Sequence, residues 1–155
     1  PADDDLMRRP PRPHTEAVIT PRMWRGILLV GVVTAACTLY VLDAALPGGF
    51  VEGAGSLRYA QSMAFTTLVL AQLFNVLNAR SDERSAFTHL FTNRWVWGAL
   101  LLSVILQALV LYVPPLQRAF GTVGLSLEDW GRCVAASSAV LWVREAGKLL
   151  TRATR

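Results

Sequence analysis

Two primary amides within an apolar stretch are the side chains of this sequence best suited to chemistry. Gln72 and Asn75 lie in a segment without charges between Arg58 and Arg80. Residues three apart share one face of a helix, and hard cations favour oxygen ligands such as an amide carbonyl. Gln72 could therefore supply an oxygen to a cation that crosses a membrane. The same amides could instead form an interhelical hydrogen bond that holds a bundle together, and their spacing leaves both interpretations open.

Motifs of soluble enzymes do not occur in the sequence. The single lysine, Lys148, lacks the surrounding pattern of a phosphate-binding loop, and no GxSxG nucleophile motif exists. His14 and His89 have no acidic partners at metal-ligand spacing. Cys37 and Cys133 each lie in an apolar stretch and are interpreted as packing residues. We therefore expect no catalytic and no cofactor-binding residue in this chain.

Four apolar segments have to position these amides. Hydrophobic residues make up 53% of the chain, and the charges cluster between long stretches that carry none. A soluble helix would show a polar face, so the pattern predicts an all-α membrane protein with four transmembrane helices in a bundle. The expected spans are 26–42, 59–77, 95–113 and 127–143. Arg132 lies one turn into the last span, which we expect to need protein neighbours for insertion.

Local signals predict where these helices end and pair. Pro114-Pro115 ends the third span, and Ser126 followed by Glu128-Asp129 is typical of a helix start. Asn78 closes the second span. Ser103 and Gln107 share a face of the third span and could bond to a neighbouring helix. Because amides in hydrocarbon need partners, we expect the face with Gln72 to point into the bundle.

The distribution of basic residues predicts the topology. Of the 15 Lys and Arg residues, twelve lie in the lead-in 1–25, the loop between the second and third spans, and the tail. A basic balance could indicate nucleic-acid binding, but arginines that flank apolar spans fit the positive-inside rule better. We expect both termini in the cytoplasm, the lipid bilayer as a partner and no nucleic-acid partner. Four prolines between Pro1 and Pro13 exclude a regular helix from the cytoplasmic lead-in loop.

Several segments together resemble the carboxy-terminal membrane region of type II cation-transporting P-type ATPases, the calcium-pump-like branch. The resemblance covers essentially the whole chain, in matching order and spacing. The segment DLMRRPPR at 5–12 resembles the loop before the seventh helix of that family, and MAFTTLVLAQLFNVLN at 63–78 resembles its eighth helix. The segment LYVPPL at 111–116 resembles the end of the ninth helix, and LSLEDW at 125–130 resembles the entry to the tenth.

The resemblance implies that residues 26–155 are the C-terminal transmembrane domain of an ATP-driven pump, with the four spans as helices seven to ten. It also implies an integral membrane protein, expected in the plasma membrane of a prokaryote. The partners would be the upstream helices and cytoplasmic domains of the same pump, together with the transported cation. The family's phosphorylated Asp-Lys-Thr-Gly motif does not occur here. ATP and Mg²⁺ would thus serve the intact parent, a P-type ATPase, whereas this chain alone should neither hydrolyse ATP nor hold a cofactor.

The resemblance also suggests roles for individual residues. Gln72 matches the position at which the eighth helix of the family adds a cation ligand. In two-site calcium pumps this ligand is an acid, so a glutamine here puts a second calcium site in doubt. The transported cation could therefore be calcium, sodium, a proton or another cation. Asn75 would be a helper or a packing residue. Arg8, Arg9 and Arg12 would dock near the phosphorylation domain and couple it to the membrane, although topology alone would also explain these arginines.

Two functions are compatible with these features. The first is a non-catalytic membrane support segment that stabilises the ion-binding helices and lends Gln72 to the ion path; a start at Pro1, inside a recognisable loop, favours such a fragment. The alternative is a free-standing four-helix membrane protein that acts as an accessory subunit or scaffold. A small channel is a weaker interpretation, because the spans contain no acidic ring and no repeated filter motif.

Overall fold

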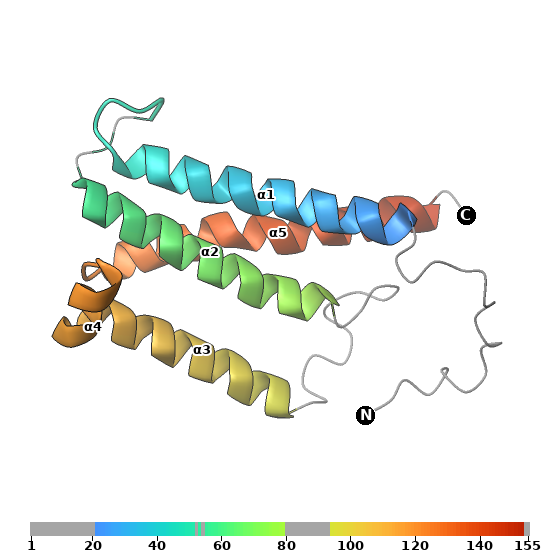
Figure 1. Cartoon of the computed structure of the whole chain (residues 1–155). Helices are drawn as coiled ribbons and strands as arrows, with labels where there is room; N and C mark the ends of the chain where they lie inside the picture. Colours follow the sequence, from blue (N-terminus) through green and yellow to red (C-terminus); the bar gives the residue numbers. More distant parts are fainter. Residues whose placement is uncertain (1–20, 52, 54, 80–93, 154–155) are drawn as a thin grey trace.

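Helices are the only regular secondary structure in the described part of the chain, as the sequence predicts. The computed structural model describes residues 21–51, 53, 55–79 and 94–153, and no strand occurs among them. Five helices follow one another: α1 (Pro21–Ala45), α2 (Leu57–Ala79), α3 (Arg94–Tyr112), α4 (Pro114–Phe120) and α5 (Leu127–Ala153) (Figure 1).

The helices match the predicted spans at their apolar centres and extend beyond them at several ends. The limits of α2 and α3 lie within two residues of the prediction. In contrast, α1 begins at Pro21, inside the expected lead-in, and includes Asp43 before it ends. Proline suits the first position of a helix because the N–H that it lacks has no helical partner there. Hydropathy therefore located the apolar centre of each helix, whereas the backbone hydrogen bonds continue into its polar flanks.

The short helix α4 makes the observed number of helices five instead of the predicted four. It occupies the expected outer loop and carries Pro114 and Pro115 at its first two positions. The two prolines that end α3 thus also start α4, since proline is tolerated in the first turn. Gly121 ends α4 with a left-handed φ of 68°, a conformation that glycine adopts without steric cost.

Three described helices are long and apolar enough to cross a membrane. They are Met23–Ala45, Leu57–Asn78 and Arg94–Tyr112. The fourth long helix, α5, is not among them, because charged residues at both ends leave only 133–143 free of charge. The weakness that the sequence indicated for this span is therefore real, and a fourth crossing is not established by the length and composition of α5.

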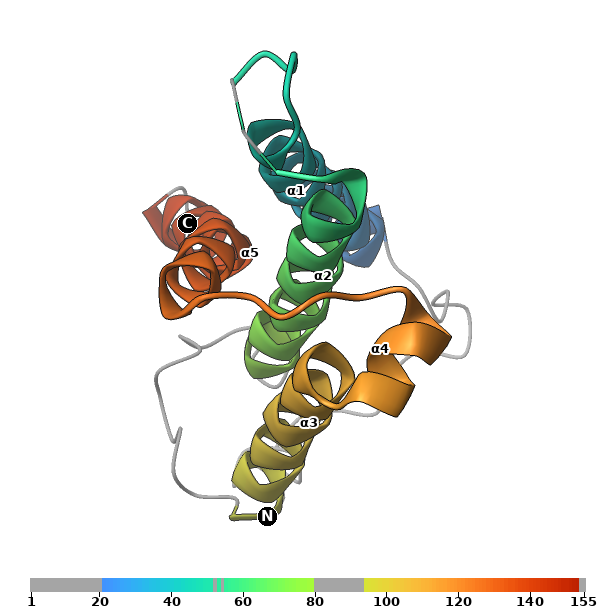
Figure 2. The same ribbon diagram turned by 90° about the vertical axis from the view of Figure 1, so that its left-hand side faces the viewer.

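Helices α1, α2 and α5 form a three-helix core with α2 at its centre. Helix α2 packs most extensively against α5 and α1, and α1 also packs against α5 (Figures 1 and 2). The start of α1, the end of α2, the start of α3 and the end of α5 lie at one end of the bundle. The buried apolar cluster lies nearer the other end and comprises Val41, Ala45, Ala60, Met63, Leu70, Leu111, Leu125 and Cys133. Within it the Cys133 thiol contacts Met63, in keeping with the packing role predicted for that cysteine.

Among the described helices, α3 packs against α4 and, less extensively, against α2, which connects it to the core. Gln107 is 4% exposed, and its Nε2 donates a 2.9 Å hydrogen bond to Thr66 Oγ1 of α2, which confirms that Gln107 bonds to a neighbouring helix. Ser103 instead bonds to the Ala99 carbonyl within α3. Large apolar side chains elsewhere on α3 are exposed, as expected of a helix that faces lipid.

Candidate functional site

The helix that carries the candidate site, α2, is enclosed on most of its circumference. From Tyr59 to Asn78 its exposed positions are few, because α1, α5 and α3 cover the rest. The four exposed residues of this stretch are Gln61, Leu68, Gln72 and Val76. Their spacings of seven and four residues place them along one face, since a helix turns about 100° per residue. Helix α2 therefore has one open stripe, which we call the open face.

Gln72 lies on the part of this open face nearer the C-terminal end of α2, and Asn75 is half-buried beside it. The expectation that Gln72 points into the bundle is wrong for the helices of this chain, because its side chain is exposed. Neither amide forms a hydrogen bond with another described residue. The structure thus does not support the interpretation that Gln72 forms a hydrogen bond between two of the described helices. It leaves the amide oxygen available to a group from outside them.

The interhelical amide bonds are made by two other residues. Asn78 is fully buried, and its Nδ2 donates a 3.3 Å hydrogen bond to the Val140 carbonyl of α5, while its Oδ1 has no partner among the described residues. Gln107 provides the bond from α3 to Thr66. Sequence spacing pointed to Gln72 as the bundle-facing amide. Asn78, three residues beyond Asn75, holds that role because α5 lies on its side of α2.

A second polar cluster joins the starts of α2 and α5. The Tyr59 hydroxyl donates a 2.6 Å hydrogen bond to Oδ1 of Asp129, which is 7% exposed. The other carboxylate oxygen of Asp129 accepts hydrogen bonds from the backbone N–H and hydroxyl of Ser126, and the Asp129 N–H donates to Ser126 Oγ. This reciprocal pattern is a capping box, so the helix start predicted at Ser126 is confirmed. The sequence indicated the cap but not Tyr59, which lies 70 residues away along the chain.

The described side chains do not assemble a complete cation site. Among residues 21–51, 53, 55–79 and 94–153, no group of three His, Cys, Asp or Glu side chains could hold a metal ion. One amide oxygen satisfies only a fraction of the roughly six to eight oxygen ligands that calcium takes. Gln72 can therefore contribute one ligand to a site whose other ligands come from elsewhere.

The remaining candidates from the sequence lie outside the described residues. They are the arginines expected to couple the lead-in to a cytoplasmic domain, Arg8, Arg9 and Arg12. Their predicted roles stay predictions.

Comparison with known proteins connects this arrangement to a family. Residues 1–150 match the family model described as cation transporting ATPase, C-terminus. The chain is 36% identical to a calcium-transporting ATPase of Bacillus subtilis, over 97% of this chain and 16% of that protein. It is 34% identical to calcium-transporting ATPase 1 of Schizosaccharomyces pombe, with the same coverage. It is 33% identical to the human calcium-transporting ATPase type 2C member 1, over 98% of this chain and 16% of that protein. The chain thus spans about a sixth of the length of these relatives.

Proposed function

The chain belongs to the family of cation-transporting ATPase C-terminal regions, and from this premise we propose that it is the closing membrane segment of an ATP-driven calcium pump. Its role in such a pump is to support the helices that bind the ion and to add one oxygen ligand through Gln72. The names of the relatives, which are calcium-transporting ATPases, support calcium as the cation.

The open face of α2 is the observation that carries this proposal. A central helix that is covered on its other sides but leaves Gln72 and three neighbours exposed needs a further partner inside a membrane. An exposed primary amide is costly in hydrocarbon. Helices that precede this chain in a pump would cover this face and place their own ligands opposite Gln72. Asn75, half-buried beside Gln72, would orient it.

A free-standing accessory or scaffold protein is the less supported function. The relatives contain the matching segment as 16% of a much longer ATPase. An independent four-helix protein would also leave the open face of α2 without a partner.

Calcium-dependent phosphorylation of the full-length protein tests the proposed function. The test uses the full-length protein, because the phosphorylated aspartate of such a pump lies outside this segment. We expect this protein to form an acid-stable phosphoenzyme from ATP and Mg²⁺ when calcium is added. The arginines Arg8, Arg9 and Arg12 would then contact the phosphorylation domain. Sodium, manganese and calcium are compared at equal ionic strength, with radiolabel incorporation as the readout. Phosphorylation that no cation stimulates would contradict the proposal of a cation pump. Stimulation by sodium alone would identify sodium, instead of calcium, as the transported cation.

We further propose four crossings, with α5 as the last and both termini in the cytoplasm. Twelve of the 15 basic residues lie on the side assigned to the cytoplasm. Packing of α5 against α1 and α2 supports its insertion, because protein neighbours offset the cost of charged residues near helix ends. The expected location is the plasma membrane of a prokaryote, in line with the Bacillus subtilis relative. Since fungal and human relatives also exist, cell fractionation is the direct check of the compartment.

Cysteine labelling tests this topology. In a full-length background with Cys37→Ala and Cys133→Ala, we expect Phe50→Cys and Arg118→Cys to react with a membrane-impermeant maleimide added outside intact cells. Ser81→Cys and Arg155→Cys should react only after permeabilisation, since positive-inside loops stay in the cytoplasm. Reaction of Arg155→Cys from outside would show that α5 does not cross.

A further inference from the structure

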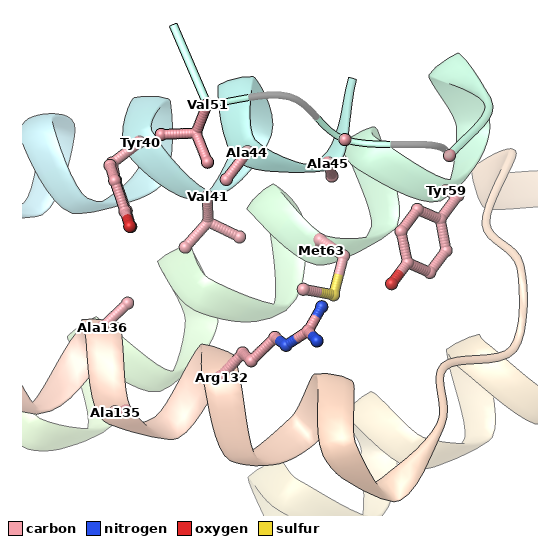
Figure 3. Close-up of a pocket in the computed structure, with 12 residues that line it drawn as sticks. Tyr40, Val41, Ala44, Ala45, Val51, Tyr59, Met63, Arg132, Ala135 and Ala136 are labelled. Atoms are coloured by element: carbon pink, nitrogen blue, oxygen red, sulfur yellow. The ribbon is translucent and has the colours of Figure 1, made fainter. Parts of the chain in front are cut away.

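A cavity of about 820 Å³ lies between α1, α2 and α5, near the end of the bundle where α1 stops and α5 starts (Figure 3). Its walls include several small residues, Ala44 and Ala45 of α1 and Ala135 and Ala136 of α5. Buried Met63 of α2 forms the floor. The cavity therefore exists because side chains on both walls are too short to meet.

The separation of α1 and α5 is confined to this end of the bundle. At the opposite end Gly26 of α1 lies directly against the guanidinium group of Arg144 on α5. Near the cavity, the described residues Gly53 and Gly55 lie over the top, and their N–H groups donate 3.1 Å hydrogen bonds to the carbonyls of Leu46 and Ala45. The cavity thus has a floor, two walls and a roof, and it is only partly open.

The opening lies between α1 and α5. Tyr40 of α1 and Arg132 of α5 line the cavity, and they are 60% and 61% exposed. Each stands five residues from the end of its helix, Ala45 for Tyr40 and Leu127 for Arg132. At a rise of about 1.5 Å per residue, that position is roughly 8 Å inside the helix end. Both residues therefore lie within about two helical turns of this end of the bundle, which the proposed topology places near the boundary between headgroups and hydrocarbon.

The inner part of the lining favours hydrocarbon over water, whereas Tyr40, Tyr59 and Arg132 add polar groups to it. Alanine, valine and methionine side chains offer no strong hydrogen bonds, and a buried water needs roughly two to four polar partners. An empty space of this size would forfeit the dispersion contacts of its lining. A lipid chain from the surrounding bilayer can enter through the side opening and restore those contacts.

Arg132 gives the opening a cationic group. Its side chain and the Tyr59 ring point toward the same space as Met63 (Figure 3). Arg132 Nη2 forms a 2.6 Å ion pair with Glu128, but a guanidinium group carries about five N–H donors, so donors remain. The Asp129 carboxylate accepts hydrogen bonds from Tyr59 and Ser126 but keeps its negative charge, so Arg132 has two acidic neighbours. The negative charge of Glu128 repels an anion nearby. Because that side chain is 75% exposed, water and salt screen the repulsion.

We propose that this cavity is a phospholipid site, in which one acyl chain fills the alanine-lined space and the phosphate diester accepts hydrogen bonds from the Arg132 guanidinium. The lipid comes from the leaflet at the Arg132 end of the bundle. The site is independent of the cation path, because it lies between α1 and α5 and not on the open face of α2. The bound chain would act as a filler that keeps α1 and α5 correctly spaced.

A photoreactive phospholipid with a diazirine on its acyl chain tests the site in the full-length protein. The protein is reconstituted in vesicles of phosphatidylglycerol and phosphatidylethanolamine, and labelled peptides are identified by mass spectrometry. We expect label on the Met63 side chain itself, which is 3% exposed and which bulk lipid cannot reach, and competition by excess unlabelled phospholipid. Label on the exposed face of α3, at residues such as Leu102 and Ile105, should not saturate. Absence of label at Met63 while α3 is labelled would overturn the proposal.

Matched variants separate the two parts of the site. Ala136→Leu fills the cavity and should abolish the saturable label, whereas Ala99→Leu on the exposed surface of α3 should leave it unchanged. Arg132→Gln should lower lipid retention about fivefold, the value of one basic residue near anionic lipid; the control is Arg118→Gln, an exposed arginine outside the cavity. Unchanged label in Ala136→Leu would overturn the proposal, and competition by inorganic phosphate alone would overturn it in favour of an anion site without an acyl chain. Labelling of Met63 in the wild-type protein tests the site without any substitution, so the test remains if a variant fails to fold.

Discussion

In the proposed full-length calcium pump, Gln72→Met is expected to raise the calcium concentration for half-maximal ATP hydrolysis about tenfold. Methionine matches the length and volume of glutamine but removes the amide oxygen, so packing is kept and one ligand is lost. Loss of an outer-shell partner of a metal ligand already costs roughly 10- to 100-fold in affinity, so loss of the ligand oxygen itself should cost at least about tenfold. The measurement is calcium-stimulated ATPase activity across a calcium titration at constant Mg²⁺ and ATP. Gln72→Glu retains an oxygen at this position and should preserve most of the affinity.

Gln61→Met is the matched control for this experiment. Gln61 is an exposed glutamine on the same face of the same helix, eleven residues and roughly 16 Å along the axis from Gln72. We expect its replacement to leave the calcium dependence unchanged. Equal shifts in both variants would mean that the open face matters for packing only, and no shift in Gln72→Met would remove this residue from the ion path.

The second large effect is expected at Asp129. Asp129→Ala removes the capping box of α5 and leaves the half-buried Tyr59 hydroxyl without its partner. A lost cap costs about 1 kcal/mol and a buried donor left unpaired about 1–3 kcal/mol, so the free energy of local opening at the α5 start should fall by about 2–4 kcal/mol. Hydrogen exchange of full-length protein in detergent should therefore be about a hundredfold faster over 127–133, because local opening controls exchange there.

Glu128→Ala controls for the loss of a negative charge in the same turn. Glu128 is exposed and pairs with Arg132 on the helix surface, and exposed ion pairs contribute little to stability. Exchange over 127–133 should stay close to the wild type. Tyr59→Phe, which deletes only the hydroxyl, should give an intermediate rate. If Asp129→Ala and Glu128→Ala exchange alike, the network around Asp129 does not anchor α5.

Most of the helical architecture follows from local features that a sequence displays. Helix α3 is the clearest case: its observed limits, Arg94 and Tyr112, lie one residue from the predicted ones, since a charge-free run between interfacial aromatics marks both ends. The start of α5 was also predictable, because Ser126 and Asp129 have capping-box spacing. The length of α5 was not, as charged residues after Val143 end the apolar run without ending the helix.

The orientation of side chains around α2 could not be predicted in the same way. Gln72, Asn75 and Asn78 are similar amides at intervals of three residues, and only the positions of neighbouring helices decide which of them is buried. Asn78 meets the Val140 carbonyl 62 residues away, and Tyr59 meets Asp129 70 residues away. Such pairings depend on how whole helices pack, which no local pattern encodes.

The position of α5 along the chain has a consequence for how the protein is made. A helix with so short an apolar centre inserts poorly into a membrane when it emerges from the ribosome without neighbouring helices. The two helices that bury it, α1 and α2, are synthesised before it. By the time α5 emerges, the surface that shields its polar positions is already in the membrane. In the proposed topology with four crossings, the order of the helices along the chain therefore makes membrane insertion of α5 a docking step onto α1 and α2, and an earlier place in the chain would deprive it of that surface.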